Sequence, residues 1–225
     1  DETIATLKEN KEIPATIVVA IWNTSKRLCE YLPQQPYCDH PSRRLRRQVI
    51  ERYGGLPGSD NYLRFIISEL KPFIDCHYHT RPTQASTFTM GSSMGGLISL
   101  YALCEYPQVF GGAGSLSTHW PIGQEAFIQY MQARLPEPGE HKIFLDYGNE
   151  ADHTGYRFSQ KQVEHILEGK GYQSGVDWLS TWYDGDPHSE RAWRARVEIP
   201  LRFLLKNDQH GKEAIDPTKG GTRVY

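Results

Sequence analysis

The sequence predicts an α/β domain in which a mostly parallel sheet carries helices on both faces. Short apolar runs that suit buried strands alternate with helix-prone stretches along the 225 residues. Residues 17–21 are apolar throughout, which is typical of a strand covered on both faces. A chain of this length buries one substantial core and shows no evident linker, so we expect a single domain over residues 1–225.

The predicted elements of the first half are a polar helix, an apolar strand, an irregular stretch rich in Pro, Arg and Tyr, an amphipathic helix, a β-prone run and an apolar helix. Their ranges are 2–11, 13–21, 24–58, 61–71, 86–90 and 97–105. The amphipathic helix places Leu63, Ile66 and Leu70 on one face. Pro72 should end it, because proline has no N–H for the helical ladder.

The predicted elements of the second half are a strand of small residues, a polar helix, an apolar strand, a helix closed by glycines, a last strand and a long last helix. Their ranges are 111–116, 124–135, 141–147, 157–168, 176–183 and 190–206. Ser189 is expected to cap the last helix, and Pro200 to kink or split it. The tail over 208–225 is polar and rich in Gly and Lys, so we expect it to be loose.

Composition excludes several classes of protein. The net charge is −2, so the basic run over 43–47 is interpreted as a solvated face and not as a nucleic-acid site. No apolar run approaches the ~18 residues of a membrane span, and no membrane partner is expected. The Cys and His residues have no regular ligand spacing, so we expect neither a metal nor another cofactor. Cys29 and Cys38 form a disulfide if the protein is exported and stay reduced if it is cytoplasmic, and the sequence leaves both open.

The pentapeptide Gly91-x-Ser93-x-Gly95, with a β-prone run before it and a helix-prone run after it, fits a nucleophile elbow. In such a turn the serine hydroxyl stands clear of the sheet. We expect both glycines to be needed because side chains there would collide with the neighbouring strand or helix. The backbone N–H of Met94, at the start of the helix, is the expected oxyanion donor.

A serine hydroxyl needs a base in contact and an acid that orients the base. In an α/β-hydrolase sheet these groups follow one another in the order serine, acid, histidine, each in a loop after a later strand. Glu150 and Asp152 both follow the strand over 141–147, and His188 follows the last strand. Asp146 ranks lower as the acid because it still lies within its strand.

Aromatic and polar residues also follow two of the other strands. Trp22 and Asn23 end the first strand, and His119 and Trp120 end the strand over 111–116. Open α/β folds bind ligands at the carboxyl ends of their strands, so we expect these four residues to line the substrate site. Their chemistry favours an aromatic or sugar-linked ester, although each of them could instead be a packing or turn residue.

These features resemble the putative-esterase family of α/β-hydrolases, which includes enterochelin-esterase-like, feruloyl-esterase-like and esterase D-like enzymes. The segments that carry the resemblance are 21–24, 60–63, 69–75, 90–96, 101–103, 116–121, 146–148 and 188–190 with Trp193. The resemblance implies hydrolysis of a carboxylic ester through an acyl-enzyme on Ser93, with His188 as the base. The sequence departs from the family pattern after Gly148, and this departure moves our choice of acid to Glu150.

The resemblance also implies strands that precede the first helix, and this chain opens directly with that helix. One of those strands would lie between the strands over 13–21 and 86–90 and would supply the second oxyanion donor. We therefore expect residues 1–225 to be an N-terminally incomplete hydrolase domain. Either a preceding segment or a second chain would complete its sheet.

The predicted function is that of a serine carboxylesterase. An acyltransferase would use the same three residues and differ in whether an alcohol outcompetes water. A non-catalytic binding domain with this fold is the third possibility, although such domains usually lack the serine or the histidine.

Overall fold

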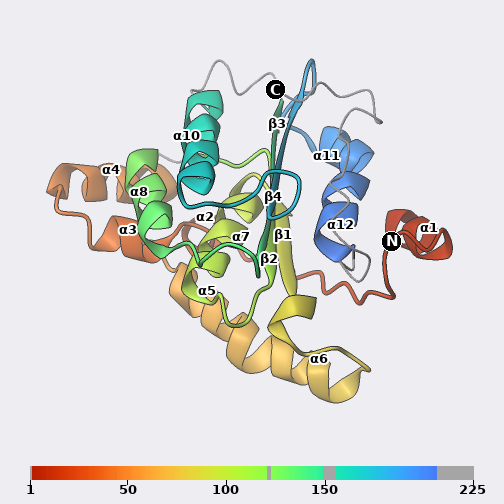
Figure 1. Ribbon diagram of the computed structural model, residues 1–225. Coiled ribbons are helices and arrows are strands. Elements are labelled where there is room, and N and C mark those ends of the chain that lie inside the picture. The colour runs from red at the N-terminus through yellow and green to blue at the C-terminus, as the bar shows by residue number, and fades with distance from the viewer. Residues whose placement is uncertain (1, 121–122, 149–155, 207–225) are drawn as a thin grey trace.

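The computed structural model describes residues 2–120, 123–148 and 156–206. Their sheet has four strands, all parallel, in the spatial order β1–β2–β3–β4 (Figure 1). The strands are β1 (Phe88–Ser92), β2 (Gly112–Leu116), β3 (Lys142–Gly148) and β4 (Trp178–Tyr183). The helices are α1 (Glu2–Glu9), α2 (Arg27–Glu30), α3 (Gln34–Cys38), α4 (Arg43–Tyr53), α5 (Ser59–Phe65), η1 (Ile66–Leu70), α6 (Lys71–His77), η2 (Gln84–Ser86), α7 (Met94–Glu105), α8 (Gln124–Arg134), α10 (Tyr156–Gly169), α11 (Glu190–Arg196) and α12 (Glu198–Leu205).

Each face of the sheet is covered by helices. In Figure 1, α7, α8 and α10 lie on one side of the strands, and α11 and α12 lie on the other. Successive side chains of a strand point to opposite faces, so Ile143 and Leu145 join the core under α7 and α10, whereas Phe144 joins the core under α12. The predicted parallel sheet with helices on both faces is therefore confirmed.

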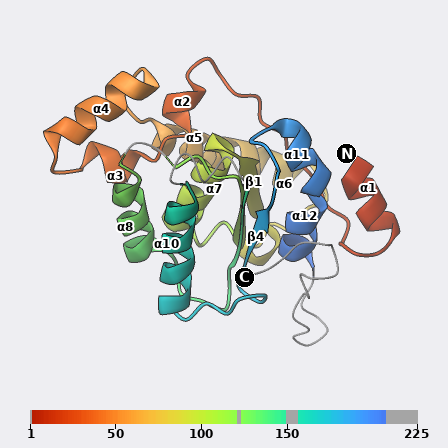
Figure 2. The same cartoon turned by 90° about the horizontal axis from the view of Figure 1, so that it is seen from above.

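The helix α1 forms a further layer outside α12, as Figures 1 and 2 both show. Leu7 and Ile13 pack with Leu201 of α12 in a small separate core. The guanidinium of Arg202 also donates to the carboxylate of Glu12 at 2.5 Å. These contacts hold the N-terminal helix on the face of the sheet that α12 covers.

The strand predicted over 13–21 is wrong. Residues 14–21 are extended but unpaired, and Val18 is 60% exposed. A strand forms only when its backbone groups pair with a neighbour, and here a groove separates the segment from β1. The apolar run was recognised correctly, but its burial depends on a partner that no local pattern shows.

The stretch over 24–58 was expected to be irregular and instead contains α2, α3 and α4. The Ser42 side chain caps α4 at its start, and Gly54 ends it with a φ of 79°. Val49 and Tyr53 of α4 are buried, whereas most of the arginines over 43–47 lie exposed. This exposure is what a solvated face requires, and the expectation that the run binds no nucleic acid stays a prediction.

Two predictions about proline had different outcomes. Pro72 does not end its helix, because the π-helical turn η1 just before it rearranges the hydrogen bonds and the chain continues as α6. The helix predicted over 190–206 is split as expected near Pro200, since α11 ends at Arg196 and α12 begins at Glu198. Pro200 then lies in the first turn of α12, where a missing N–H costs little.

Other expectations concern single residue types and the ends of the chain. All four cysteines are free thiols, including Cys29 and Cys38. Within the described ranges, no helix is long and apolar enough to cross a membrane. The expected loose tail over 208–225 lies outside the described residues.

Candidate active site

Ser93 lies in the sharp turn that joins β1 to α7. Its backbone has φ 55° and ψ −120°, a strained conformation that residues other than glycine rarely adopt. The turn is held because the Ser93 N–H donates to the carbonyl of Leu116 at 2.8 Å, in the neighbouring strand. The geometry is that of the predicted nucleophile elbow.

His188 reaches Ser93 from the loop between β4 and α11. Its Nε2 lies 2.9 Å from the Oγ of Ser93, within hydrogen-bond distance. The His188 ring meets the Trp193 ring edge-on at 4.9 Å between centroids. Ser189 caps α11 by accepting from the Ala192 N–H, so the loop that carries His188 is fixed at its helical end. The structure thus brings together two groups that lie 95 residues apart in the sequence.

The third predicted catalytic residue is the acid that would orient His188. Glu150 and Asp152 both lie outside the described residues. Asp146 is buried in β3, where its two carboxylate oxygens accept hydrogen bonds from the guanidinium of Arg196. Sequence analysis ranked Asp146 below Glu150 and Asp152, and it did not single out Arg196.

The N-terminus of α7 lies directly after the nucleophile. Met94 is the first residue of this helix, and its N–H is among those without a partner in the preceding turn. The positive end of the helix dipole stabilises negative charge at this position. The Met94 N–H thus lies at the positive end of α7, directly after Ser93.

His119 lies beside the nucleophile and between two tyrosines. Its backbone N–H donates to the Ser93 carbonyl at 3.2 Å. Its Nε2 is 3.1 Å from the hydroxyl of Tyr53, and its Nδ1 is 2.6 Å from that of Tyr156. Sequence analysis chose His119 but missed both tyrosines, which come from α4 and α10 and carry no local signal.

The other three residues expected in the substrate site are not brought to Ser93. Trp120 is buried in the core and packs against Phe127, so its expected place in the site is wrong. Trp22 is 95% exposed. The wall of the groove beside β1 includes Ile21 but neither Trp22 nor Asn23. Trp22 and Asn23 follow an unpaired segment, so no strand end directs them to the catalytic edge.

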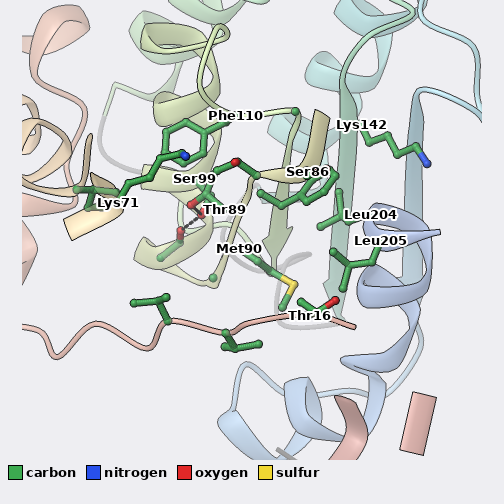
Figure 3. Close-up of a pocket in the computed structure, with 18 of the residues that line it drawn as sticks. Thr16, Lys71, Ser86, Thr89, Met90, Ser99, Phe110, Lys142, Leu204 and Leu205 are labelled. Atoms are coloured by element: carbon green, nitrogen blue, oxygen red, sulfur yellow. Dashed lines mark hydrogen bonds between the residues drawn. The ribbon is translucent and has the colours of Figure 1, made fainter. Parts of the chain in front are cut away.

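A groove of about 1560 Å³ runs beside β1 and ends at Ser93 and His188. Residues 14–21 form one wall and β1 the other. In Figure 3, Met90 projects from β1 toward the segment that carries Thr16, with Leu204 and Leu205 of α12 beside it. Since β1 is the edge strand of the described sheet, its outer backbone groups face this groove.

A parallel α/β sheet with a nucleophile elbow after one strand and a histidine after the last one defines an α/β-hydrolase fold. Residues 10–200 match the family model described as putative esterase, and the chain belongs to that family. The resemblance stated from the sequence is therefore confirmed. It supports a hydrolase of the esterase type.

The protein YbbA of Bacillus subtilis, described as uncharacterized, is 26% identical over 178 residues, which are 76% of this chain and 66% of YbbA. An IroE-like serine hydrolase from Shewanella oneidensis has a TM-score of 0.65 at 18% identity, covering 90% of this chain and 65% of that one. The enterobactin esterase FES from Shigella flexneri has a TM-score of 0.58 at 18% identity, covering 88% of this chain but 46% of its own. The chain thus spans between about half and two thirds of the length of these relatives.

The two glycines of the elbow are expected to differ in their tolerance of a side chain. A Cβ on Gly91 would lie 2.6 Å from the backbone carbon of Gly95, whereas a Cβ on Gly95 would meet nothing within 4 Å. The sequence-based expectation that Gly95 avoids a collision is therefore wrong. Gly91→Ala should lower the free energy of unfolding by about 1–3 kcal/mol, and Gly95→Ala should leave it nearly unchanged. Urea denaturation of both variants checks this, and equal losses would contradict it.

The partly buried imidazole of His119 should make stability depend on pH. Burial, and to a smaller extent His188 and Arg52, lower the pKa of His119 to about 4. Between pH 6.5 and 4 the unfolded chain therefore binds more protons at this residue than the folded protein, so acidification lowers the free energy of unfolding. Over that window the contribution is up to about 3 kcal/mol, at about 1.4 kcal/mol for each pKa unit.

The variant His119→Gln removes this titration and keeps polar groups near both tyrosines. Denaturation of the wild type and the variant should be compared at pH 7, 5.5 and 4. The wild type should lose more stability than the variant as the pH falls. Parallel losses in the two proteins would show that His119 is not the group responsible.

Proposed function

We propose that this protein is a serine carboxylesterase that forms an acyl-enzyme on Ser93. One observation carries the proposal, namely the 2.9 Å contact between the Ser93 Oγ and the His188 Nε2 at the end of a strained elbow. The family membership and the structural neighbours described as esterases and serine hydrolases support a hydrolase at the coarser level. One of these neighbours, IroE, is described in complex with DFP.

In the proposed reaction, His188 Nε2 takes the hydroxyl proton while the Ser93 Oγ attacks the carbonyl carbon of the ester. The Met94 N–H stabilises the oxyanion that develops. The tetrahedral intermediate breaks its bond to the leaving oxygen, which takes the proton from His188 and departs as an alcohol. A water molecule then gives a proton to His188 and attacks the acyl carbon, and collapse releases the acid and returns the proton to Ser93. We propose Glu150 as the group that orients His188.

The proposed substrate is a small-molecule or sugar-linked ester with an aromatic group. The His119 N–H donates to the Ser93 carbonyl, and its ring contacts the hydroxyls and rings of Tyr53 and Tyr156, so an aromatic cluster adjoins Ser93 and supports this proposal. Among the structural neighbours are a protein described as an enterobactin esterase, in the presence of 2,3-di-hydroxy-N-benzoyl-glycine, and one described as a ferulic acid esterase. A panel of acetyl, feruloyl and dihydroxybenzoyl esters would rank the substrates.

An acyltransferase and a non-catalytic domain remain the alternatives. Product analysis with added alcohol acceptors separates transfer from hydrolysis, because only a transferase forms a new ester. Reaction with a fluorophosphonate probe separates an enzyme from a silent domain, because only an activated serine is labelled.

Replacement of the nucleophile tests the proposed function directly. Ser93→Ala should lower the rate of p-nitrophenyl acetate hydrolysis by on the order of 10³-fold or more, because the residual site cannot form the acyl-enzyme. Ser68→Ala, at an exposed position of η1, is a matched serine control and should retain full activity. Retention of the wild-type rate by the Ser93 variant would refute the proposal.

We further propose that an extended segment preceding α1 lies in the groove beside β1. Three features support this proposal: the open edge of β1, the exposed apolar run over 17–19, and the position of α1 on α12. A strand ahead of α1 would form, with α1 and residues 14–21, the strand–helix–strand unit that parallel neighbours require. The turn at its end would offer a second N–H to the oxyanion.

The mass of the active enzyme tests whether a segment preceding α1 is part of the protein. Enzyme purified from its natural source should have an intact mass above the 25.8 kDa of residues 1–225. Residues 1–225 alone should have a kcat about 10²-fold lower, because one oxyanion donor is lost. An active monomer of 25.8 kDa would exclude a preceding segment, and an active dimer of that subunit mass would favour a second copy.

A further inference from the structure

Arg196, the last residue of α11, is a buried cation that connects the loops after β2 and β4 to strand β3. Its Nε and Nη2 donate to the two carboxylate oxygens of Asp146 at 3.0 Å each. Its Nη2 also donates to the Ser117 Oγ at 2.9 Å, and its Nη1 donates to Asp186 at 2.7 Å. The guanidinium carbon lies 4.4 Å from the centre of the Tyr183 ring. The side chain of Arg196 is only 4% exposed, and that of Asp146 is fully buried.

A buried ion pair of this kind is weak evidence for a contribution to stability, because removing both charges from water costs nearly as much as their attraction returns. Burial raises the pKa of Asp146, and the hydrogen bonds from Arg196 and Ser117 oppose that rise. The bidentate geometry and the additional donors keep this carboxylate satisfied. Such a network holds the segments that it joins in one relative position, and here these segments are strand β3 and the loops with Asp186 and Ser117.

The contact with Asp186 fixes the loop that carries His188. Asp186 is two residues before His188, and its backbone lies against the end of β3, where a Cβ on Gly148 would be 2.2 Å from the Asp186 carbonyl oxygen. Arg196 therefore joins the loop after β4 to a carboxylate anchored inside β3. The loop that carries His188 is therefore fixed by the Arg196–Asp186 ion pair, and the His188 ring itself packs against Trp193.

The contact with Ser117 fixes the other neighbour of the nucleophile. Ser117 has a φ of 46°, and its N–H donates to Asp146 Oδ1 at 2.8 Å. Two residues later, the His119 N–H donates to the Ser93 carbonyl. The same guanidinium thus supports the turn that adjoins Ser93 and the loop that presents His188.

We propose that Arg196 is a positioning residue that holds His188 at hydrogen-bond distance from Ser93 by binding Asp186 to Asp146. The inference rests on the proposed function, since it assigns Arg196 a role in the same reaction. Arg196 touches neither Ser93 nor His188 in the contacts above and acts through the loop.

Asp186 offers the cleaner test, because its side chain is 37% exposed and its loss leaves the Arg196–Asp146 pair intact. Asp186→Ala should lower kcat by about 10–100-fold and change KM less than about threefold, since a misplacement of about 1 Å costs up to about 10² in rate. Asp186→Asn keeps an oxygen that accepts from Nη1 and should restore kcat to within about threefold of the wild type. Arg196→Lys keeps the charge without the planar fork and should lose at least as much activity as Asp186→Ala.

Arg202→Lys is the matched control. Arg202 lies on α12 and pairs with Glu198 of the same helix and with Glu12, which follows α1, and with neither Asp146 nor Asp186. Its kinetic constants should equal those of the wild type. Melting temperatures are measured for every variant, so that a loss of folded protein is not mistaken for misplacement. A purely structural role would lower the active fraction of Asp186→Ala, found by fluorophosphonate titration, and would leave kcat per active site unchanged.

Ser93→Ala is assayed beside these variants so that the two proposals fail separately. If Ser93→Ala is inactive and Asp186→Ala has the wild-type kcat per active site, the role of Arg196 is overturned and the proposed function stands. If Ser93→Ala remains active, the proposed function fails. The positioning role is then decided by hydrogen exchange of the amides in 184–189, where faster exchange in Asp186→Ala supports it and unchanged exchange overturns it.

Discussion

The backbone strain at Ser93 is the constraint on which the rest of the site depends. A non-glycine residue with a φ of 55° costs on the order of 1–3 kcal/mol, so the surroundings must hold it in place. They do so through the hydrogen bond from Ser93 to Leu116 and through the buried helix α7, which begins at the next residue. Because Gly91 has no side chain, the backbone at Gly95 can approach closely enough to complete the turn. The hydroxyl is thereby presented at the edge where the other strands end.

The parallel sheet brings residues from other loops next to the turn at Ser93. Parallel register aligns Ser92 with Leu116, Leu116 with Asp146, and Gly148 with Tyr183. The loops that follow β2 and β4 therefore emerge at the same edge of the sheet as Ser93. The loop after β2 brings His119, and the loop after β4 brings His188. Burial lowers the pKa of His119 to about 4, so at neutral pH its imidazole adds hydrogen-bonding groups and no positive charge beside Ser93.

Most of the sheet and its helices could be predicted from the sequence because their signals are local. The β-prone run of β1, the small residues of β2, the apolar run of β3, the glycines of the elbow and the Ser189 cap are all local signals within a few residues of what they specify. The histidine followed from chain order. In contrast, the pairing of residues 14–21 depends on a neighbour, and the apolar pattern alone does not reveal whether that neighbour is present. His119 and Trp120 are adjacent, but one contacts Ser93 and the other packs in the core, because the chain turns between them. The contacts of Arg196 join residues up to 79 positions apart, and no spacing rule predicts them.

The two sides of the nucleophile differ in how they are supported. Toward β2, β3 and β4, the turn is backed by a buried core and by the ion network of Arg196, so the positions of Ser93 and His188 depend little on what lies beyond β1. Toward residues 14–21, β1 faces a groove that these residues line on the other side. The contact between the Ser93 Oγ and the His188 Nε2 is formed within the described residues. If, as proposed above, a segment in the groove supplies the second oxyanion donor, that donor is held independently of this contact. Binding of an irreversible serine probe and full turnover of an ester then need not respond alike to changes along the groove.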